Sequence, residues 1–202
     1  GLYNRGTLTL TNSTVSGNSA SSGGGLHSDG TLTLTSSTVS GNSAATRGGG
    51  LYNSGTLTLT NSTVTANTAA TGGGLYTGTG GTATAISTII AGNTGGDLSG
   101  TLQPASANNL INVDPLLGAL AFNGGPTQTH AILDGSPALG AGSNPLSLTT
   151  DQRGGFFARG TAVDIGAYQR QTLNLVVDTL VDEDDGNFGA GDLSLREALA
   201  VA

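Results

Sequence analysis

The chain has 202 residues and a net charge of −7, with 35 glycines, no cysteine and only 9% charged residues. Its six basic residues are spread along the chain, which excludes a nucleic-acid-binding surface, because such a surface needs clustered cations to replace phosphate counterions. Without cysteine there is no disulfide and no thiolate metal site, and no apolar run reaches the roughly 20 residues of a transmembrane helix.

The first half of the chain repeats one short pattern. The sequence Thr-Leu-Thr-Leu-Thr begins at Thr7, returns at Thr31 and Thr56, and is modified from Thr82, at intervals of 24, 25 and 26 residues. Strict alternation of polar and apolar residues predicts a strand with one exposed and one buried face. A period of this length without a helical segment predicts an all-β fold, a parallel β-helix or solenoid with one coil per repeat.

Equivalent residues of successive coils are expected to stack in columns. Apolar columns would form the core, and an asparagine column would lie at a turn, where Asn tolerates left-handed backbone angles and its amide can bond to the next copy. The columns are Leu2, Leu26, Leu51 and Leu75; Val15, Val39, Val64 and Ile90; and Asn18, Asn42, Asn67 and Asn93.

The threonines that alternate with the leucines are predicted to face solvent. They form the columns Thr7, Thr31, Thr56 and Thr82, and Thr9, Thr33, Thr58 and Thr84, with a shorter column at 11, 35 and 60. β-Branched polar residues suit an exposed pleated surface. An ice-binding plane and a set of glycan attachment sites are two further interpretations of the same face.

A second outward column consists of Tyr3, His27, Tyr52 and Tyr76. Aromatic side chains in this arrangement either stack on one another and stiffen the solenoid or present rings to sugars. His27 stands in a tyrosine column, so we do not expect it to be catalytic or a metal ligand.

The fourth coil departs from the pattern. Ile86 and Ile89 stand where the preceding coil has Thr60 and Thr63. Apolar residues on an outer column predict that another segment covers them, and we expect the following chain to do so as a cap on the end of the solenoid.

Few residues could carry catalysis. The coils contain a single acid, Asp29, and no carboxylate pair of the kind used by glycoside hydrolases. Asp151, Arg153, Asp164 and His130 follow the coils and could converge. An ion pair of Arg153 with Asp151 or Asp164 that fixes the cap is the favoured interpretation, and we expect the chain not to be an enzyme.

Beyond residue 97 the chain is rich in turns, with a last strand expected within residues 108–117. The motifs at 123–130, 134–138, 150–154 and 164–168 resemble the choice-of-anchor Q domain, which ends extracellular right-handed β-helix proteins of bacteria. The resemblance covers roughly residues 85–170, and the coils are similar to the Gly-Gly-rich repeats of polymorphic outer-membrane proteins. It implies a right-handed β-helix outside the cell.

Residues 172–202 contain a strand pattern, an acidic loop and a capping box from Ser194 to Glu197 that predicts a short terminal helix. This segment is similar to the CSLREA domain, with Leu193 in place of the motif's cysteine. That domain normally precedes such a β-helix, which implies a tandem array. The loop offers weak Ca²⁺ candidates, although it does not match an EF-hand: Asp182, Asp184, Asp185 and Asp192.

We therefore expect β-helix coils at 1–96, a final coil and cap at 97–170, and a segment at 171–202 that starts a following unit. Gly1 lies within a repeat, so the chain is expected to be part of a longer one. The hypothesis is a non-catalytic, extracellular bacterial stalk, fibre or adhesin-like element without a cofactor, whose partners are copies of itself or surface glycans. A carbohydrate-binding or carbohydrate-processing β-helix is the alternative, and ice binding is the third.

Overall fold

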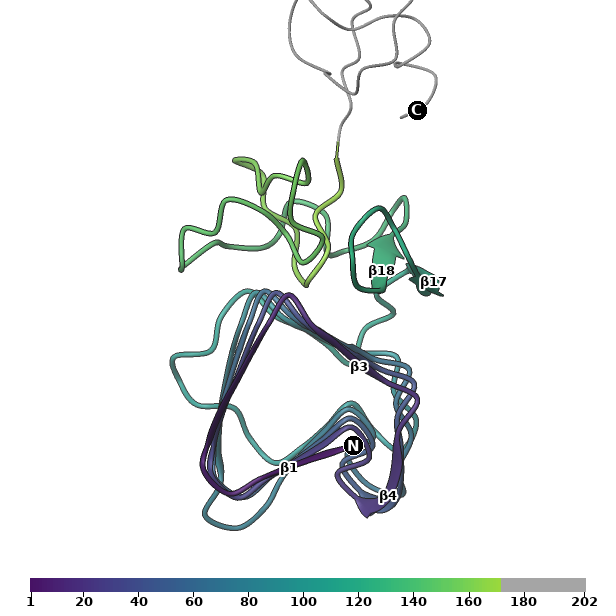
Figure 1. Ribbon diagram of the computed structural model, residues 1–202, viewed down its shortest axis with the longest axis vertical. Coiled ribbons are helices and arrows are strands. Elements are labelled where there is room, and N and C mark those ends of the chain that lie inside the picture. The colour runs from purple at the N-terminus through teal and green to yellow at the C-terminus, as the bar shows by residue number, and fades with distance from the viewer. Residues whose placement is uncertain (172–202) are drawn as a thin grey trace, which may run out of the picture. The chain divides into compact units, whose positions relative to one another are not determined.

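A computed structural model describes residues 1–171, which form a parallel β-solenoid followed by an irregular region (Figure 1). The chain divides into two units, residues 1–170 and 171–202, and the description below concerns the first. The predicted terminal helix and the four aspartates proposed for Ca²⁺ lie outside the described residues.

Three parallel sheets form the sides of the solenoid. Sheet A contains β1 (Leu2–Asn4), β5 (Leu26–Ser28), β9 (Leu51–Asn53), β12 (Leu75–Thr77) and β15 (Leu98–Ser99). Sheet B contains β2 (Thr7–Thr11), β6 (Thr31–Thr35), β10 (Thr56–Thr60) and β13 (Thr82–Ile86). Sheet C contains β3 (Thr14–Ser16), β7 (Thr38–Ser40), β11 (Thr63–Thr65), β14 (Ile89–Ile90) and β16 (Leu110–Ile111).

Two smaller sheets complete the fold. β4 (Ser19–Ser22) pairs in parallel with β8 (Ser43–Arg47) at a corner of the solenoid. β17 (Leu117–Ala121) and β18 (Thr129–Ile132) form an antiparallel hairpin after the last coil. None of the residues from 1 to 171 forms a helix, which confirms the all-β prediction.

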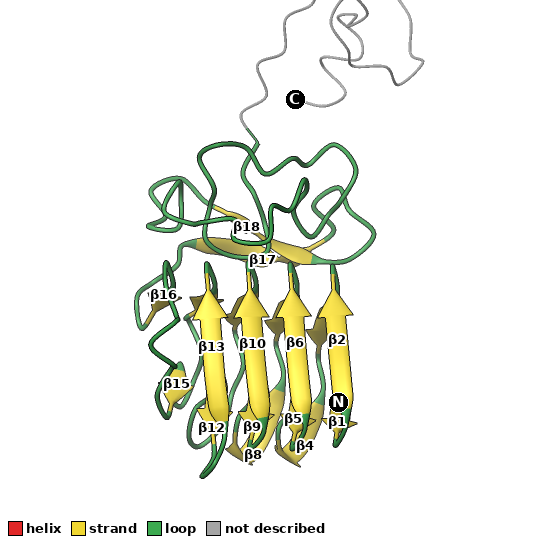
Figure 2. Cartoon of the chain, turned by 90° about the vertical axis from the view of Figure 1, so that its left-hand side faces the viewer, coloured by secondary structure: helices red, strands yellow, loops and turns green. Residues whose placement is uncertain are grey.

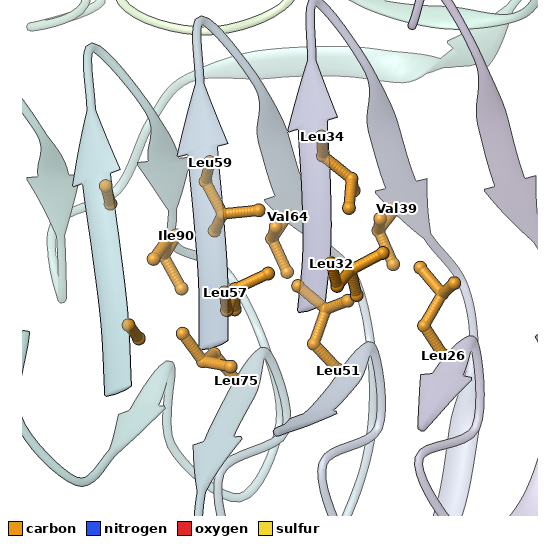
Figure 3. Close-up of a cluster of buried hydrophobic side chains, with 12 residues drawn as sticks. Leu26, Leu32, Leu34, Val39, Leu51, Leu57, Leu59, Val64, Leu75 and Ile90 are labelled. Atoms are coloured by element: carbon orange, nitrogen blue, oxygen red, sulfur yellow. The ribbon is translucent and has the colours of Figure 1, made fainter. Parts of the chain in front are cut away.

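The register follows the repeat. Thr7 pairs with Thr31, Thr31 with Thr56, and Thr56 with Thr82, and the rest of each strand stays in step. Inward leucines and valines therefore stack on their own copies, and the central ones are essentially inaccessible to solvent (Figure 3). Leu2 is 45% exposed because the first coil has a neighbouring coil on one side only.

The asparagine column forms a hydrogen-bonded ladder. Asn18 donates to the side-chain oxygen of Asn42 at 3.0 Å, and Asn42 and Asn67 repeat the bond to the next copy. Asn93 donates to Asp97 at 2.9 Å, and a carboxylate, which only accepts, ends the ladder there. The left-handed residue of the turn is the one before each asparagine, as at Ala66, and not the asparagine as expected.

The last coil is short. β15 pairs with β12 and β16 pairs with β14, so residues 98–111 add one incomplete coil to the stack. Leu98, Leu102 and Ile111 pack against the core. This partial coil closes the far end of the apolar interior.

The region from 115 to 170, here called the flank, lies beside the solenoid along sheet C (Figures 1 and 2). It covers Ile89, which is 1% exposed and packs with Ala138 and Ile165, as the apolar substitution in that column predicted. The prediction placed a final coil and a cap within residues 97–170; residues 98–111 lie on the end of the solenoid, and the flank lies along its side. Sheet C has polar and apolar outward groups that the flank can bond and bury, whereas residues 98–111 already cover the end.

The flank also explains a departure from the predicted threonine columns. Thr35 and Thr60, in the short column at 11, 35 and 60, are buried, although their strand positions face outward. They end strands of sheet B at the corner next to the flank, where Asn61 donates to the carbonyl of Ser143 at 2.8 Å.

Candidate functional site

The three sides of the solenoid carry different chemistry. Sheet A presents the aromatic column, sheet B presents threonine, and sheet C is covered by the flank. Each side is a candidate for function, and the contacts of its outward residues decide what it can do.

The aromatic column is continuous along sheet A. The rings of His27 and Tyr52 stack at 4.4 Å between centroids, and those of Tyr52 and Tyr76 stack at 5.1 Å. Tyr3 meets His27 edge to face at 4.9 Å. Of the two interpretations of this column, self-stacking is therefore what the structure shows.

Arginine lies against this column at two places, in the turn before β9 and directly after β1. Gly48 has φ +64°, and a Cβ there would lie 2.4 Å from the carbonyl oxygen of Leu51, so this turn requires glycine. The tight turn leaves Arg47 over the ring of Tyr76, 5.2 Å from its centroid. Arg5 similarly lies 5.1 Å from the ring centroid of Tyr3.

Asp29, the single acid of the coils, is held by the same column. It accepts hydrogen bonds from the hydroxyls of Ser54, at 2.5 Å, and Tyr3, and lies 3.3 Å from the imidazole of His27. The bonds from Ser54 and Tyr3 lower the pKa of Asp29 to about 2, with a smaller contribution from His27. The carboxylate is therefore ionised and its oxygens are already engaged.

The outward threonines of sheet B, here called the Thr face, are arranged differently. The members at the start of each strand are exposed, and in the second column Thr9 is exposed while the other three are partly exposed. Figure 2 shows the four strands side by side with no other described segment crossing in front of them. The Thr face comprises Thr7, Thr9, Thr31, Thr33, Thr56, Thr58, Thr82 and Thr84.

On sheet C the outward hydroxyls bond to the flank. The side-chain amide of Gln152 accepts from Thr38 at 2.6 Å and donates to Thr14 at 2.8 Å, so it joins two coils. In the third coil, the hydroxyl of Thr63 accepts the backbone N–H of Ala167 at 3.0 Å. The flank is thus a lateral brace that spans several coils.

Beneath this contact lies a buried ion pair. Arg153 donates to Asp151 at 2.7 Å, and the two side chains are 3% and 0% exposed. Asp151 also accepts the backbone N–H of Gln169 at 2.7 Å. The guanidinium of Arg153 lies between the rings of Phe157 and Tyr168, 3.6 and 3.8 Å from their centroids. The Arg153–Asp151 pair expected from the sequence is present.

The other two residues of that expected set serve different contacts. Asp164 accepts from the backbone N–H groups of Gly140 and Arg170, each at 2.7 Å. His130 lies on β18 and bonds to Ser40 and Gly118. Asp151, Arg153 and Asp164 therefore fix turns of the flank, and His130 joins the flank to sheet C.

Sequence reasoning missed Arg159, which is also buried in the flank. It donates to the carbonyl of Gly166 at 3.0 Å, while its Nε and Nη1 atoms have no hydrogen-bond partner. Burial lowers the pKa of Arg159 to about 10, although the nearby carboxylates of Asp151 and Asp164 act to raise it. An isolated arginine in a turn-rich segment gives no sequence signal of such burial.

Acidification is expected to loosen the brace through His130. A carbonyl only accepts, so Nδ1 donates to Gly118 at 2.7 Å and Nε2 of the neutral ring accepts from Ser40 at 2.8 Å. Burial lowers the pKa of His130 below its ordinary 6.5. The neutral ring of His130 therefore contributes its full stabilisation above pH 6.5, the ordinary pKa of histidine. This contribution is lost as the pH falls through the lowered pKa of His130 in the folded state.

Thermal unfolding between about pH 8 and about pH 4 checks this, because histidine titrates within that range. The Tm of the wild type should fall further on acidification than the Tm of His130→Gln, because the variant carries no titrating ring at this position. Parallel pH profiles for the two proteins would contradict the assignment.

Among residues 1–171 the structure contains no group of three or more His, Asp or Glu side chains placed to hold a metal ion. No helix within the same residues is long and apolar enough to cross a membrane. No family model, curated protein or solved structure matches the chain.

Proposed function

We propose that this chain is a non-catalytic structural element of an extracellular bacterial protein, used as a stalk, fibre or adhesin-like repeat. The observation that carries the proposal is the in-register stacking of the coils in sheets A, B and C, with core, asparagine ladder and aromatic column each continuous. Each backbone bond between coils contributes about 1 kcal/mol. Many such bonds in parallel columns make a short rod that resists bending.

The environments of the ionisable groups support a non-catalytic role. The oxygens of Asp29 are taken up by Ser54 and Tyr3, and Asp151 and Arg153 are shielded from solvent. A general acid or base has to reach its substrate. These groups instead hold one part of the chain against another.

The packing of the aromatic column also disfavours sugar binding. A sugar stacks on the face of a ring. In this column the faces of Tyr52 and Tyr76 lie against neighbouring rings or under Arg47. These ring faces are therefore occupied by contacts within the solenoid.

An extracellular location and a tandem arrangement are proposed from the sequence resemblances. The turn motifs of the flank resemble a domain that ends extracellular β-helices, and residues 172–202 are similar to one that begins them. A start module after an end module fits an array of rods joined end to end. We propose that such an array forms a filament on the cell surface.

Electron microscopy of a chain carrying several units tests the proposal. We expect rods of constant width whose length grows with the number of units and which associate at their ends. Compact particles, or units that remain strictly separate, would count against a stalk or filament. Retention on a glycan array or release of sugar from a polysaccharide would instead favour the carbohydrate-binding or carbohydrate-processing alternative.

A further inference from the structure

The Thr face is a regular grid. Each of its two columns has one threonine per coil, and the columns lie two residues apart along every strand. Standard sheet geometry places neighbouring threonines roughly 4.8 Å apart within a column and about 6.7 Å apart along a strand. Both repeats are close to the spacings of oxygen atoms on surfaces of hexagonal ice.

The threonine grid is kept in the fourth coil, although that coil differs from the others at other positions. The two extra residues of the fourth coil lie in the turn around Gly80, and all five pairs of β10 with β13 remain in register. Inward leucines become Ala83 and Ala85 in β13, while the outward Thr82 and Thr84 remain. An exposed face needed only for solubility would tolerate Ser, Asn or Lys at these positions.

The face is also uncharged and uncovered. β2, β6 and β10 read Thr-Leu-Thr-Leu-Thr and β13 reads Thr-Ala-Thr-Ala-Ile, so no strand of sheet B carries a charged side chain. Sheet C, with similar hydroxyls, is occupied by the flank, and sheet A by stacked rings. Sheet B alone of the three has outward threonines that are exposed or partly exposed in every one of its strands, and Figure 2 shows no described segment in front of these strands.

We propose that the Thr face binds ice. Threonine suits this role because its β-branched side chain is stiff at χ1, which fixes both the hydroxyl and the methyl in space. Water over methyl groups has restricted orientations, and hydroxyls at the lattice repeat can hold that layer in positions that continue a crystal plane. Each contact is weak, and the array acts through all eight side chains together.

This activity is separate from the proposed stalk role. A rod can be stiff whether or not one side binds ice, and electron microscopy reports only on the rod. A filament with such a face would attach its bearer to ice.

The test uses the 202-residue chain in a nanolitre osmometer with a view of single ice crystals. The wild type is expected to show thermal hysteresis and faceted crystals. Thr58→Tyr places a bulky ring in the middle of the grid and should abolish both. Thr46→Tyr, at an exposed position of β8 outside sheet B, is the matched control and should leave both unchanged.

Circular dichroism and gel filtration at the measuring temperature show whether each variant is folded. If Thr58→Tyr does not fold, Thr58→Ser, which removes only the methyl group, should still lower the hysteresis. The proposal is overturned if the wild type neither shapes ice nor gives hysteresis. It is equally overturned if folded grid variants match the wild type, or if the control loses the activity to the same extent.

Discussion

Replacing Asp151 with alanine is expected to destabilise the flank by about 3–5 kcal/mol, the usual cost of leaving one member of a buried ion pair without its partner. The guanidinium of Arg153 would remain buried between two rings, with no carboxylate beside it. The backbone N–H of Gln169 would lose its acceptor as well. We expect a lower midpoint for the flank in urea unfolding, ahead of the solenoid.

The chain offers a matched control in Asp134→Ala. Asp134 pairs with Arg170 in the same region, but its side chain is 90% exposed and that of Arg170 is 41% exposed. An exposed pair contributes between about 0 and 1 kcal/mol. The two variants therefore remove the same kind of bond from different environments.

Limited proteolysis of the flank, together with urea titration, distinguishes the outcomes. Rapid cleavage within residues 115–170 in Asp151→Ala, with the coils left intact, is the expected pattern. Equal stability of the two variants would mean that burial of the Arg153–Asp151 pair does not hold the flank together.

The solenoid was predictable because the repeat in its sequence determines which residues of neighbouring coils pair. Thr-Leu-Thr-Leu-Thr fixes which residues face inward, and the recurrence at Thr31 and Thr56 fixes which residues stack. Residues of the same type stack on one another in successive coils, so the role of each column follows from its residue type. The asparagine ladder was predictable for the same reason, although the left-handed angle proved to belong to the residue before it.

The flank was less predictable because its contacts join a repeated part of the chain to an irregular one. Gln152 bonds to Thr38, 114 residues away, and to Thr14, 138 residues away, and nothing in the local sequence around Gln152 marks those partners. Ile89 was the useful signal, since an apolar residue in an outward polar column has to be covered. It showed that a cover exists but not that the cover lies along sheet C.

The asparagine ladder supports a second prediction, for Asn67→Ala. Asn67 is fully buried, and its side-chain oxygen accepts from the backbone and side-chain N–H groups of Asn42 at 3.0 and 2.9 Å. Its own amide donates to Asn93 and to the carbonyl of Val39. Each buried polar group left without a partner costs about 1–3 kcal/mol, so we expect a loss of about 3–5 kcal/mol in the free energy of unfolding.

Asn18→Ala is the control, because it removes the same side chain from the half-buried first rung, where water can replace the lost bonds at a cost of about 1 kcal/mol. A solenoid is held together by contacts between neighbouring coils, so a break in the middle should uncouple the coils on either side of it. Hydrogen exchange should then accelerate on both sides of Asn67 in Asn67→Ala and only in the first coil of Asn18→Ala. Equal losses of stability in the two variants would show that the ladder contributes no more at its buried centre than at its end, and the rigidity attributed to the rod would have to come from the apolar columns alone.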